Sequence, residues 1–104
     1  MKHLIAASLT TLALVAGSIQ ANDTDATCAG WKQYAYNVHM GRSEGVSITE
    51  AMPQAREYGT FAVQVVSDAY DDMPVSAITT GGRQHEYAER FSERIAVRCY
   101  RALQ

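Results

Sequence analysis

The sequence has few residues of the kinds that build cofactor sites. Of its 104 residues two are cysteine, three are histidine and four are methionine, and the absence of a C-x-x-C-H motif excludes covalent attachment of a c-type haem. The potential soft metal ligands lack the i, i+4 or C-x-x-C spacings that prearrange a site. They are His39, Met40, Met52, Met73 and His85. We therefore expect no metal or other cofactor, methionines in the core and histidines on the surface; copper bound by these soft ligands is the alternative.

A catalytic constellation of defined geometry is also lacking. Nucleophilic catalysis needs a base beside a serine or a cysteine, and both cysteines are better explained as a disulfide. Paired carboxylates for hydrolysis could come from four acidic residues, but such pairs occur in every acidic helical protein. These residues are Glu57, Asp68, Asp71 and Asp72. We therefore predict that the protein is not an enzyme.

Long apolar runs are absent except near the amino terminus. A short basic start precedes the apolar run from Leu4 to Ala16, and small and polar residues follow up to Ala21. This order is typical of a cleaved secretory signal, and the run is shorter than the ~20 apolar residues that span a bilayer. We predict a signal peptide at residues 1–21 and a single helical domain at residues 22–104, periplasmic or secreted. A retained membrane anchor is the alternative.

Negative charge exceeds positive charge. When Lys2 is removed with the signal, eight basic residues face 11 acidic ones, which gives a net charge of about −3 with histidine neutral. Export and this sign argue against a nucleic-acid partner. The 83 residues that remain are enough for one small domain with a modest core.

The two cysteines stand near the two ends of the predicted domain. Small exported proteins with two cysteines commonly form one disulfide, which we predict between Cys28 and Cys99. Closing a loop of about 70 residues would stabilise the fold by roughly 4 kcal/mol in the chain-entropy model. The bond requires the two Cα atoms to lie within about 7 Å, so the first and last helices should be neighbours.

Hydrophobic spacing predicts helices in most of the domain. The first runs from Thr24 to a turn at residues 41–45. Its inward positions are Cys28, Trp31, Ala35, Val38 and Arg42, while Lys32, Gln33, Asn37 and His39 fall largely on other faces. Ser47 and Glu50 form a capping box that begins a second, short helix, which Pro53 should kink or shorten.

A third helix is predicted from Phe61 to Asp71, after a break at Gly59. Its valines also suit a strand, but the lack of alternation makes the strand the weaker alternative. Asp71 and Asp72 lie at the end of the helix where negative charge is unfavourable, and we interpret them as a solvated helix end rather than as a cation site. An irregular linker follows across residues 73–81, with three potential capping residues: Ser76, Thr79 and Thr80.

The last helix has the clearest pattern. Its apolar positions recur every four residues: Tyr87, Phe91, Ile95, Cys99 and Leu103. The opposite face carries Glu86 and four arginines, which we name the arginine stripe: Arg90, Arg94, Arg98 and Arg101. These arginines repel one another unless carboxylates or a partner lie nearby. We predict that the stripe binds a partner protein; a solvated face is the alternative.

Tyrosine is abundant for a chain of this size. The six tyrosines are Tyr34, Tyr36, Tyr58, Tyr70, Tyr87 and Tyr100. Tyrosine is enriched in binding surfaces because its ring is rigid and amphipathic. It also suits the boundary of a small core, so both interpretations stay open.

The order of these features extends over most of the domain. It runs Cys28, Trp31, Ala35, Met40-Gly-Arg42, Gly45 to Met52, Ala69-Tyr70, Pro74, Phe91 and Cys99-Tyr100. In this order the chain resembles a loose group of short exported two-cysteine helical proteins of proteobacteria and their phages, largely without assigned function. The resemblance implies a periplasmic helical domain with one disulfide, and it supplies no active site.

The sequence thus predicts an all-α fold, a small bundle of three main helices plus one short capped helix, with the first and last helices joined by a disulfide. The expected function is non-catalytic binding of another envelope or secreted protein, of the inhibitor or immunity type. The alternative is a periplasmic chaperone induced by acid or stress. Acid would protonate all 11 carboxylates of the mature chain and give a net charge of about +10, which would loosen the bundle.

Overall fold

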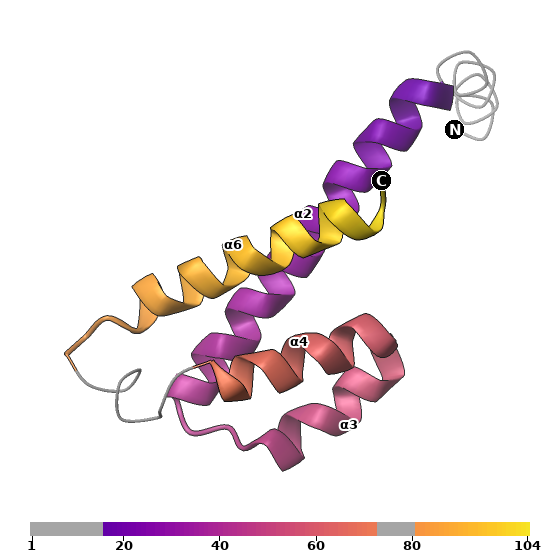
Figure 1. Cartoon of the computed structure of the whole chain (residues 1–104). Coiled ribbons are helices and arrows are strands. Elements are labelled where there is room, and N and C mark those ends of the chain that lie inside the picture. Colours follow the sequence, from indigo (N-terminus) through magenta and orange to yellow (C-terminus); the bar gives the residue numbers. More distant parts are fainter. Residues whose placement is uncertain (1–15, 73–80) are drawn as a thin grey trace, which may run out of the picture.

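The computed structural model describes residues 16–72 and 81–104, and the regular secondary structure within these residues is all helical (Figure 1). Its four helices are α2 (Ala16–Ser43), α3 (Ile48–Tyr58), α4 (Thr60–Asp71) and α6 (Gln84–Ala102). The predicted all-α fold of three main helices and one short capped helix is confirmed. The strand considered for the valine-rich segment is wrong, because that segment forms α4.

The first and last helices cross and are joined covalently. The Cys28 and Cys99 sulfur atoms are bonded, with 5.5 Å between the two Cα atoms, so the predicted disulfide is confirmed. Around the bond, the Lys32 ammonium reaches the carboxylates of Glu89 and Glu93, each at 3.1 Å. We call α2 and α6 the stapled pair. Such a bond persists in oxidising compartments.

Helix α2 begins earlier than the sequence predicts. It starts at Ala16 rather than near Thr24 and runs through the predicted signal cleavage point after Ala21. The start near Thr24 was predicted from the helical spacing of Cys28, Trp31 and Ala35, and this spacing does not show how far the helix extends before them. The predicted apolar run of the signal lies mostly outside the described residues. In the described part of the chain, no helix combines the length and the apolar character needed to cross a membrane.

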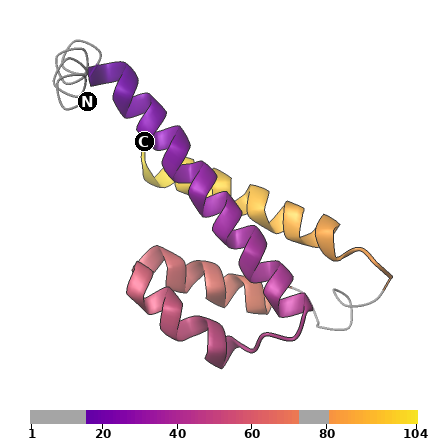
Figure 2. The same cartoon turned by 180° about the vertical axis from the view of Figure 1, so that it is seen from behind.

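Helices α3 and α4 form a tight hairpin beside the carboxyl-terminal half of α2 (Figure 2). The predicted capping box begins α3: the Glu50 amide donates to the Ser47 hydroxyl, and the Ser47 amide donates to the Glu50 carboxylate. Pro53 lies inside α3 without ending it. Gly59 alone separates the helices, with φ 110° and ψ −176°. A residue with a side chain would be strained at this φ, so glycine permits the one-residue turn.

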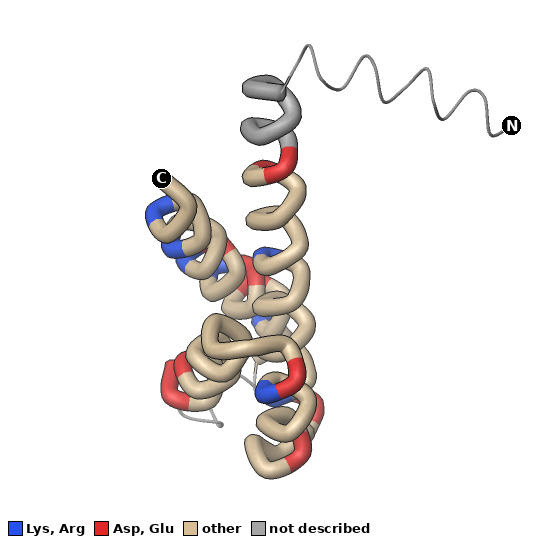
Figure 3. Tube along the Cα trace, turned by 90° about the vertical axis from the view of Figure 1, so that its right-hand side faces the viewer, with Lys and Arg blue, Asp and Glu red and all other residues tan. Residues whose placement is uncertain are grey.

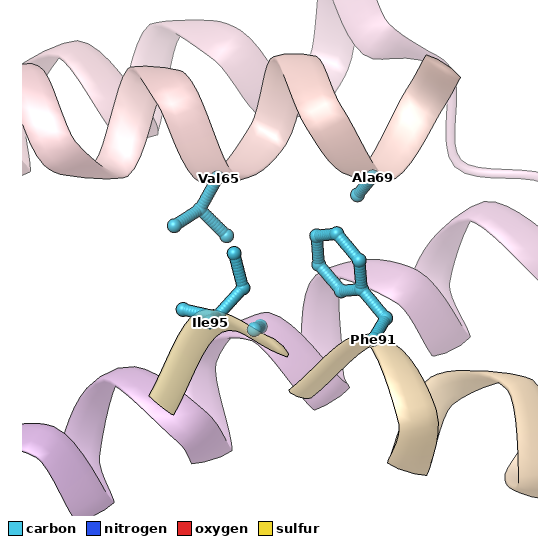
Figure 4. Close-up of a cluster of buried hydrophobic side chains, with 5 residues drawn as sticks. Val65, Ala69, Phe91 and Ile95 are labelled. Atoms are coloured by element: carbon cyan, nitrogen blue, oxygen red, sulfur yellow. The ribbon is translucent and has the colours of Figure 1, made fainter. Parts of the chain in front are cut away.

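The main core lies where the hairpin meets the stapled pair. Val65 and Ala69 of α4 face Phe91 and Ile95 of α6, and Ala35 of α2 completes the cluster (Figure 4). All five side chains are at most 1% exposed. Phe91, Ile95 and Cys99 of the four-residue spacing are thus buried as predicted, whereas Leu103, the last position of that spacing, follows the end of α6 and is 50% exposed.

Helix α6 begins after two glycines with left-handed backbones, Gly81 at φ 77° and Gly82 at φ 65°. The helix thus starts at Gln84, three residues before Tyr87, the first apolar position that the sequence predicts for it. The predicted linker at residues 73–81, with its capping residues Ser76, Thr79 and Thr80, lies outside the described residues except for Gly81.

Candidate functional site

The arginine stripe follows α6 toward the carboxyl terminus (Figure 3). Its two central members face α4 rather than open solvent: Arg94 pairs with Asp72, and Arg98 pairs with Asp68. These carboxylates offset the repulsion that the four-residue spacing of the arginines implies. Arg94 and Arg98 therefore have partners within the chain. Nearby carboxylates were one of the two ways in which the sequence analysis expected the repulsion to be relieved.

The outer members of the stripe differ from the central ones. Arg90 pairs with Glu86 one turn earlier on α6, at 2.5 Å. Arg101 is exposed, and we find no ion pair for it among the described residues. Arg94 and Arg98 thus form ion pairs with α4 or the residue that follows it, whereas Arg90 and Arg101 do not. Partner binding by the stripe stays a prediction.

An open pocket of about 300 Å³ lies between α4 and α6 beside the central arginines. It is lined by Asp68, Asp71, Asp72, Phe91, Arg94, Ile95 and Arg98. Two of its three aspartates are already paired with its two arginines. Its charged groups therefore serve mainly to join α4 to α6.

His39 is a correction to the sequence analysis, which placed the histidines on the surface. Its side chain is 0% exposed, and its ring lies 5.2 Å from the Phe91 ring. The spacing of the buried stripe could have revealed this position, since His39 follows Ala35 by four residues and precedes Arg42 by three. Arg42 is also buried, as predicted, and donates to the Ala69 carbonyl at 2.8 Å.

Asp72 is a second correction. The sequence suggested a solvated helix end, but the side chain is only 16% exposed and contacts both His39, at 3.1 Å from Nε2, and Arg94. The unfavourable position of Asp72 at the carboxyl end of α4 is thus offset by a cation from another helix. Asp71, next to it, is exposed as predicted.

Three tyrosines line a groove of about 390 Å³ between α2 and the hairpin. We call it the tyrosine groove. Its lining residues are Tyr34, Asn37, Val38, Gly41, Val46, Glu50, Ala51, Gln54, Tyr58 and Tyr70. The groove brings together residues from α2, α3 and α4 and the turn before α3, so it exists only in the folded protein.

The aromatic rings of the groove support one another. Tyr34 packs edge to face against Tyr58 at 5.7 Å and against Trp31 at 5.5 Å, and Trp31 packs in the same way on Phe61 at 4.9 Å. Edge-to-face pairs of this kind add to the stabilisation from burial and restrict the rings. The Tyr70 hydroxyl donates to the Val46 carbonyl at 2.6 Å. The groove is therefore a largely preformed surface.

Burial raises the pKa of Tyr34, with a smaller contribution from Tyr58, and it raises the pKa of Tyr70 as well. Both hydroxyls are protonated at neutral pH; that of Tyr70 already donates to the Val46 carbonyl, and that of Tyr34 can donate to a bound group. Tyr58 is the most accessible ring of the groove, with 54% of its surface exposed. The groove thus combines apolar ring surface with hydroxyl donors, which is the combination found in protein-binding surfaces.

The other three tyrosines lie outside the groove and contact polar partners. The Tyr36 hydroxyl bonds to Nδ1 of His85 at 2.5 Å, and the Tyr100 hydroxyl donates to Asp25 at 2.9 Å. The Arg83 guanidinium lies 5.5 Å from the Tyr87 ring. The first two contacts join α2 to α6, as expected for tyrosine at a core boundary.

The predicted soft ligands are not gathered together. Within residues 16–72 and 81–104, no group of three histidine, cysteine or acidic side chains could hold a metal ion. Met40 and Met52 are half-buried rather than in the core, and Met73 lies outside the described residues. His85 is on the surface, as predicted, and His39 is bonded to Asp72.

Comparisons of the chain with models of known protein families, with curated proteins and with solved structures found no match.

Proposed function

We propose that this protein is a non-catalytic binding module of the periplasm or the secreted fraction, and that the tyrosine groove contacts its partner protein. The observation that supports this most strongly is the set of three tyrosines from three segments of the chain, held in one open groove. Tyrosine loses little conformational entropy when it binds, because its side chain has few rotatable bonds. A preformed aromatic groove therefore favours recognition of a protein surface or segment.

The polar residues of the groove support the same function. Asn37 and Gln54 add amide donors and acceptors beside the rings, and Glu50 is the only charged residue in the lining. The Glu50 carboxylate is already used by the capping box. The groove therefore offers hydrogen bonds without a strong charge, which suits a polar peptide backbone more than an ionic ligand.

The outer members of the arginine stripe are a secondary part of the proposal. Arg90 and Arg101 do not pair with α4, so an acidic partner could reach them without breaking the bundle. The partner would be another envelope or secreted protein, and the module would act as an inhibitor or immunity-type protein.

Capture of binding proteins from an exported-protein extract tests the groove. A Tyr58→Ala variant should retain the partner at least about tenfold less well than the parent protein, as expected for an aromatic hot spot. Tyr100→Ala is the matched control, because Tyr100 is also an exposed tyrosine, 41% exposed, but lies outside the groove. Undiminished capture by the Tyr58 variant, or an equal loss in both variants, would contradict the proposal.

The arginine stripe needs a different pair of variants. Reversal of Arg94 or Arg98 would place glutamate beside Asp72 or Asp68 and disturb the fold. Replacement of Arg90 and Arg101 by glutamine avoids these carboxylates and places no second acidic residue beside Glu86. If the stripe contributes to binding, this double variant should lose the partner while keeping the helical circular-dichroism spectrum and the unfolding midpoint of the parent.

A stress chaperone is the second candidate, and one observation favours it. The ion pairs between the hairpin and α6 depend on two carboxylates, Asp68 and Asp72, which strong acid would neutralise. Loss of these pairs would weaken the cover over the apolar core. The test is light scattering of an aggregating model client at low pH, with and without the protein. Unchanged aggregation would rule out this candidate.

A further inference from the structure

The hairpin and the stapled pair are joined by contacts that converge on the carboxyl-terminal end of α4. There Arg42 of α2 donates to the Ala69 carbonyl, and Asp72 bonds to both His39 of α2 and Arg94 of α6. In the described residues no disulfide ties the hairpin to the pair, whereas α2 and α6 share one. Asp72 thus connects all three helices that meet at this point.

His39 lies at the centre of this junction. Its side chain is 0% exposed, with the Asp72 carboxylate at the end of α4 bonded to one ring nitrogen and the Phe91 ring of α6 packed nearby. The charged groups that face it are Arg42 from α2, Asp72 from α4 and Arg94 from α6. The connecting residues 73–80 contain no ionisable side chain. The balance of charge around the ring is therefore fixed by one carboxylate and two guanidinium groups.

The hydrogen bonds favour the neutral ring. Asp72 is paired with Arg94 as a carboxylate and can only accept, so we assign the proton of neutral His39 to Nε2. The other nitrogen, Nδ1, is buried and has no hydrogen-bond partner among the described residues. Protonation would place a donor there with nothing to accept it, which is costly in a buried site. It would also add a third cation to the junction.

The effect on stability has a definite sign. Burial lowers the pKa of His39 below its ordinary value of 6.5. The bond to Asp72 raises this pKa by a smaller amount, and the charges of Arg42 and Arg94 lower it further. Below pH 6.5 the unfolded chain therefore binds a proton at this residue that the folded protein does not. The folded state therefore loses stability as the pH falls from 6.5 to the lower pKa that His39 has in the folded protein. Below that pKa the ring is protonated in both states, and His39 causes no further loss.

We propose that His39 is an acid switch: its protonation releases the α3–α4 hairpin from the stapled pair, while the Cys28–Cys99 disulfide keeps α2 and α6 together. Exposure of the ring to water requires movement of α4 or of α6. Helix α6 is bonded covalently to α2, so α4 is the helix that can leave. Its departure would expose the apolar faces that meet at Phe91 and Ile95 and would dismantle the tyrosine groove.

This inference does not rest on either proposed function, because it concerns the protein alone. It is tested on the oxidised protein by nuclear magnetic resonance from pH 7.5 to 4. The histidine ring signals report protonation, and amide hydrogen exchange, corrected for the intrinsic effect of pH, reports the helices. We expect α4 amides to lose at least about tenfold in protection as the His39 ring titrates, with the α2 and α6 amides near the disulfide still protected. Loss of protection in all helices in one step, or α4 protection that survives the His39 titration, would overturn the proposal.

Two matched variants assign the effect to one ring. His39→Gln keeps a nitrogen donor for Asp72 but cannot be protonated, so release should move to a pH lower by about one unit or more. His85→Gln removes the surface histidine and should leave the release pH unchanged. Release of the His39 variant at the parent's pH would overturn the proposal. If that variant does not fold, the titration of the parent protein with its assigned ring signals still decides the question.

Discussion

The stapled pair and the hairpin are both helical, but they are held in different ways. Helices α2 and α6 are joined by a covalent bond, by exposed polar contacts such as Lys32 with Glu89, and by buried packing of Ala35 and His39 with Phe91. The hairpin is attached through its apolar face and through a partly buried junction at Asp72. The association of the pair therefore has a covalent part that depends on the redox state, whereas that of the hairpin depends only on packing and on polar contacts such as those of Asp72.

Because of this difference, we expect the stapled pair and the hairpin to differ in local stability. A disulfide stabilises a protein by restricting its unfolded chain, so its effect does not require exact packing, and the loop that it closes from Cys28 to Cys99 includes the hairpin. A packed interface loses stability with each atom removed from it. Changes to the staple and changes to the hairpin should therefore give distinguishable results, and the variants below are chosen to separate them.

Removal of the disulfide should have the largest effect, because it eliminates the main difference between the two regions. A Cys28→Ser, Cys99→Ser variant opens a loop with a sequence separation of 71 residues, and we expect a loss of roughly 4 kcal/mol in the free energy of unfolding. Urea unfolding followed by circular dichroism measures it. The parent protein treated with a reducing agent is the control and should show a similar loss. An unchanged unfolding midpoint would show that packing alone holds α2 to α6.

The stapled pair was also the more predictable region. Its cysteines could be paired from the sequence because the chain has only two, and the four-residue spacing of Phe91, Ile95 and Cys99 identified the inner face of α6. The cysteine count and the spacing within one helix can both be read directly from the sequence. The capping box at Ser47 was predictable for the same reason, since its partners are three residues apart.

The junction between the hairpin and the pair was less predictable. Its contacts join His39, Asp72 and Arg94, which are separated by tens of residues, and only the packing of three helices brings them together. Propensity and spacing describe one helix at a time, so they could identify the arginine stripe but not the carboxylates opposite it. The tyrosine groove escaped for the same reason, because its walls come from three helices and the turn before α3.

Truncation of Phe91 should give the second largest effect, and it tests the packed interface of the hairpin. The ring is 1% exposed and meets Val65 and Ala69 across the interface, so Phe91→Ala should cost about 3 kcal/mol of unfolding free energy. The control is Val97→Ala on the same helix, where the side chain is 46% exposed and the cost should stay within about 0.5 kcal/mol. Equal costs for the two variants would mean that the hairpin does not pack on α6 as described.

A smaller effect should distinguish two members of the arginine stripe. Arg94→Gln removes the partner of Asp72, and because the arginine side chain is 55% exposed we expect a loss of only about 1 kcal/mol. Arg90→Gln is the matched control, one turn away on α6, and breaks only an exposed pair with Glu86 on the same helix. It should leave the unfolding midpoint unchanged. Salt should reduce the difference between the variants, since the pair that Arg94 forms is partly screened.

The loss of the α3 cap should be the smallest effect and the most local. Ser47→Ala removes the hydroxyl that accepts from the Glu50 amide, and caps of this type contribute about 1 kcal/mol or less when they are exposed. Ser67→Ala, an exposed serine within α4, is the control and should be neutral or slightly stabilising, because alanine favours helices. Amide exchange should show the loss in the first turn of α3 before any change in α2 or α6. A loss that reached the stapled pair equally would mean that the hairpin and the pair unfold as one unit, which would remove the distinction between them.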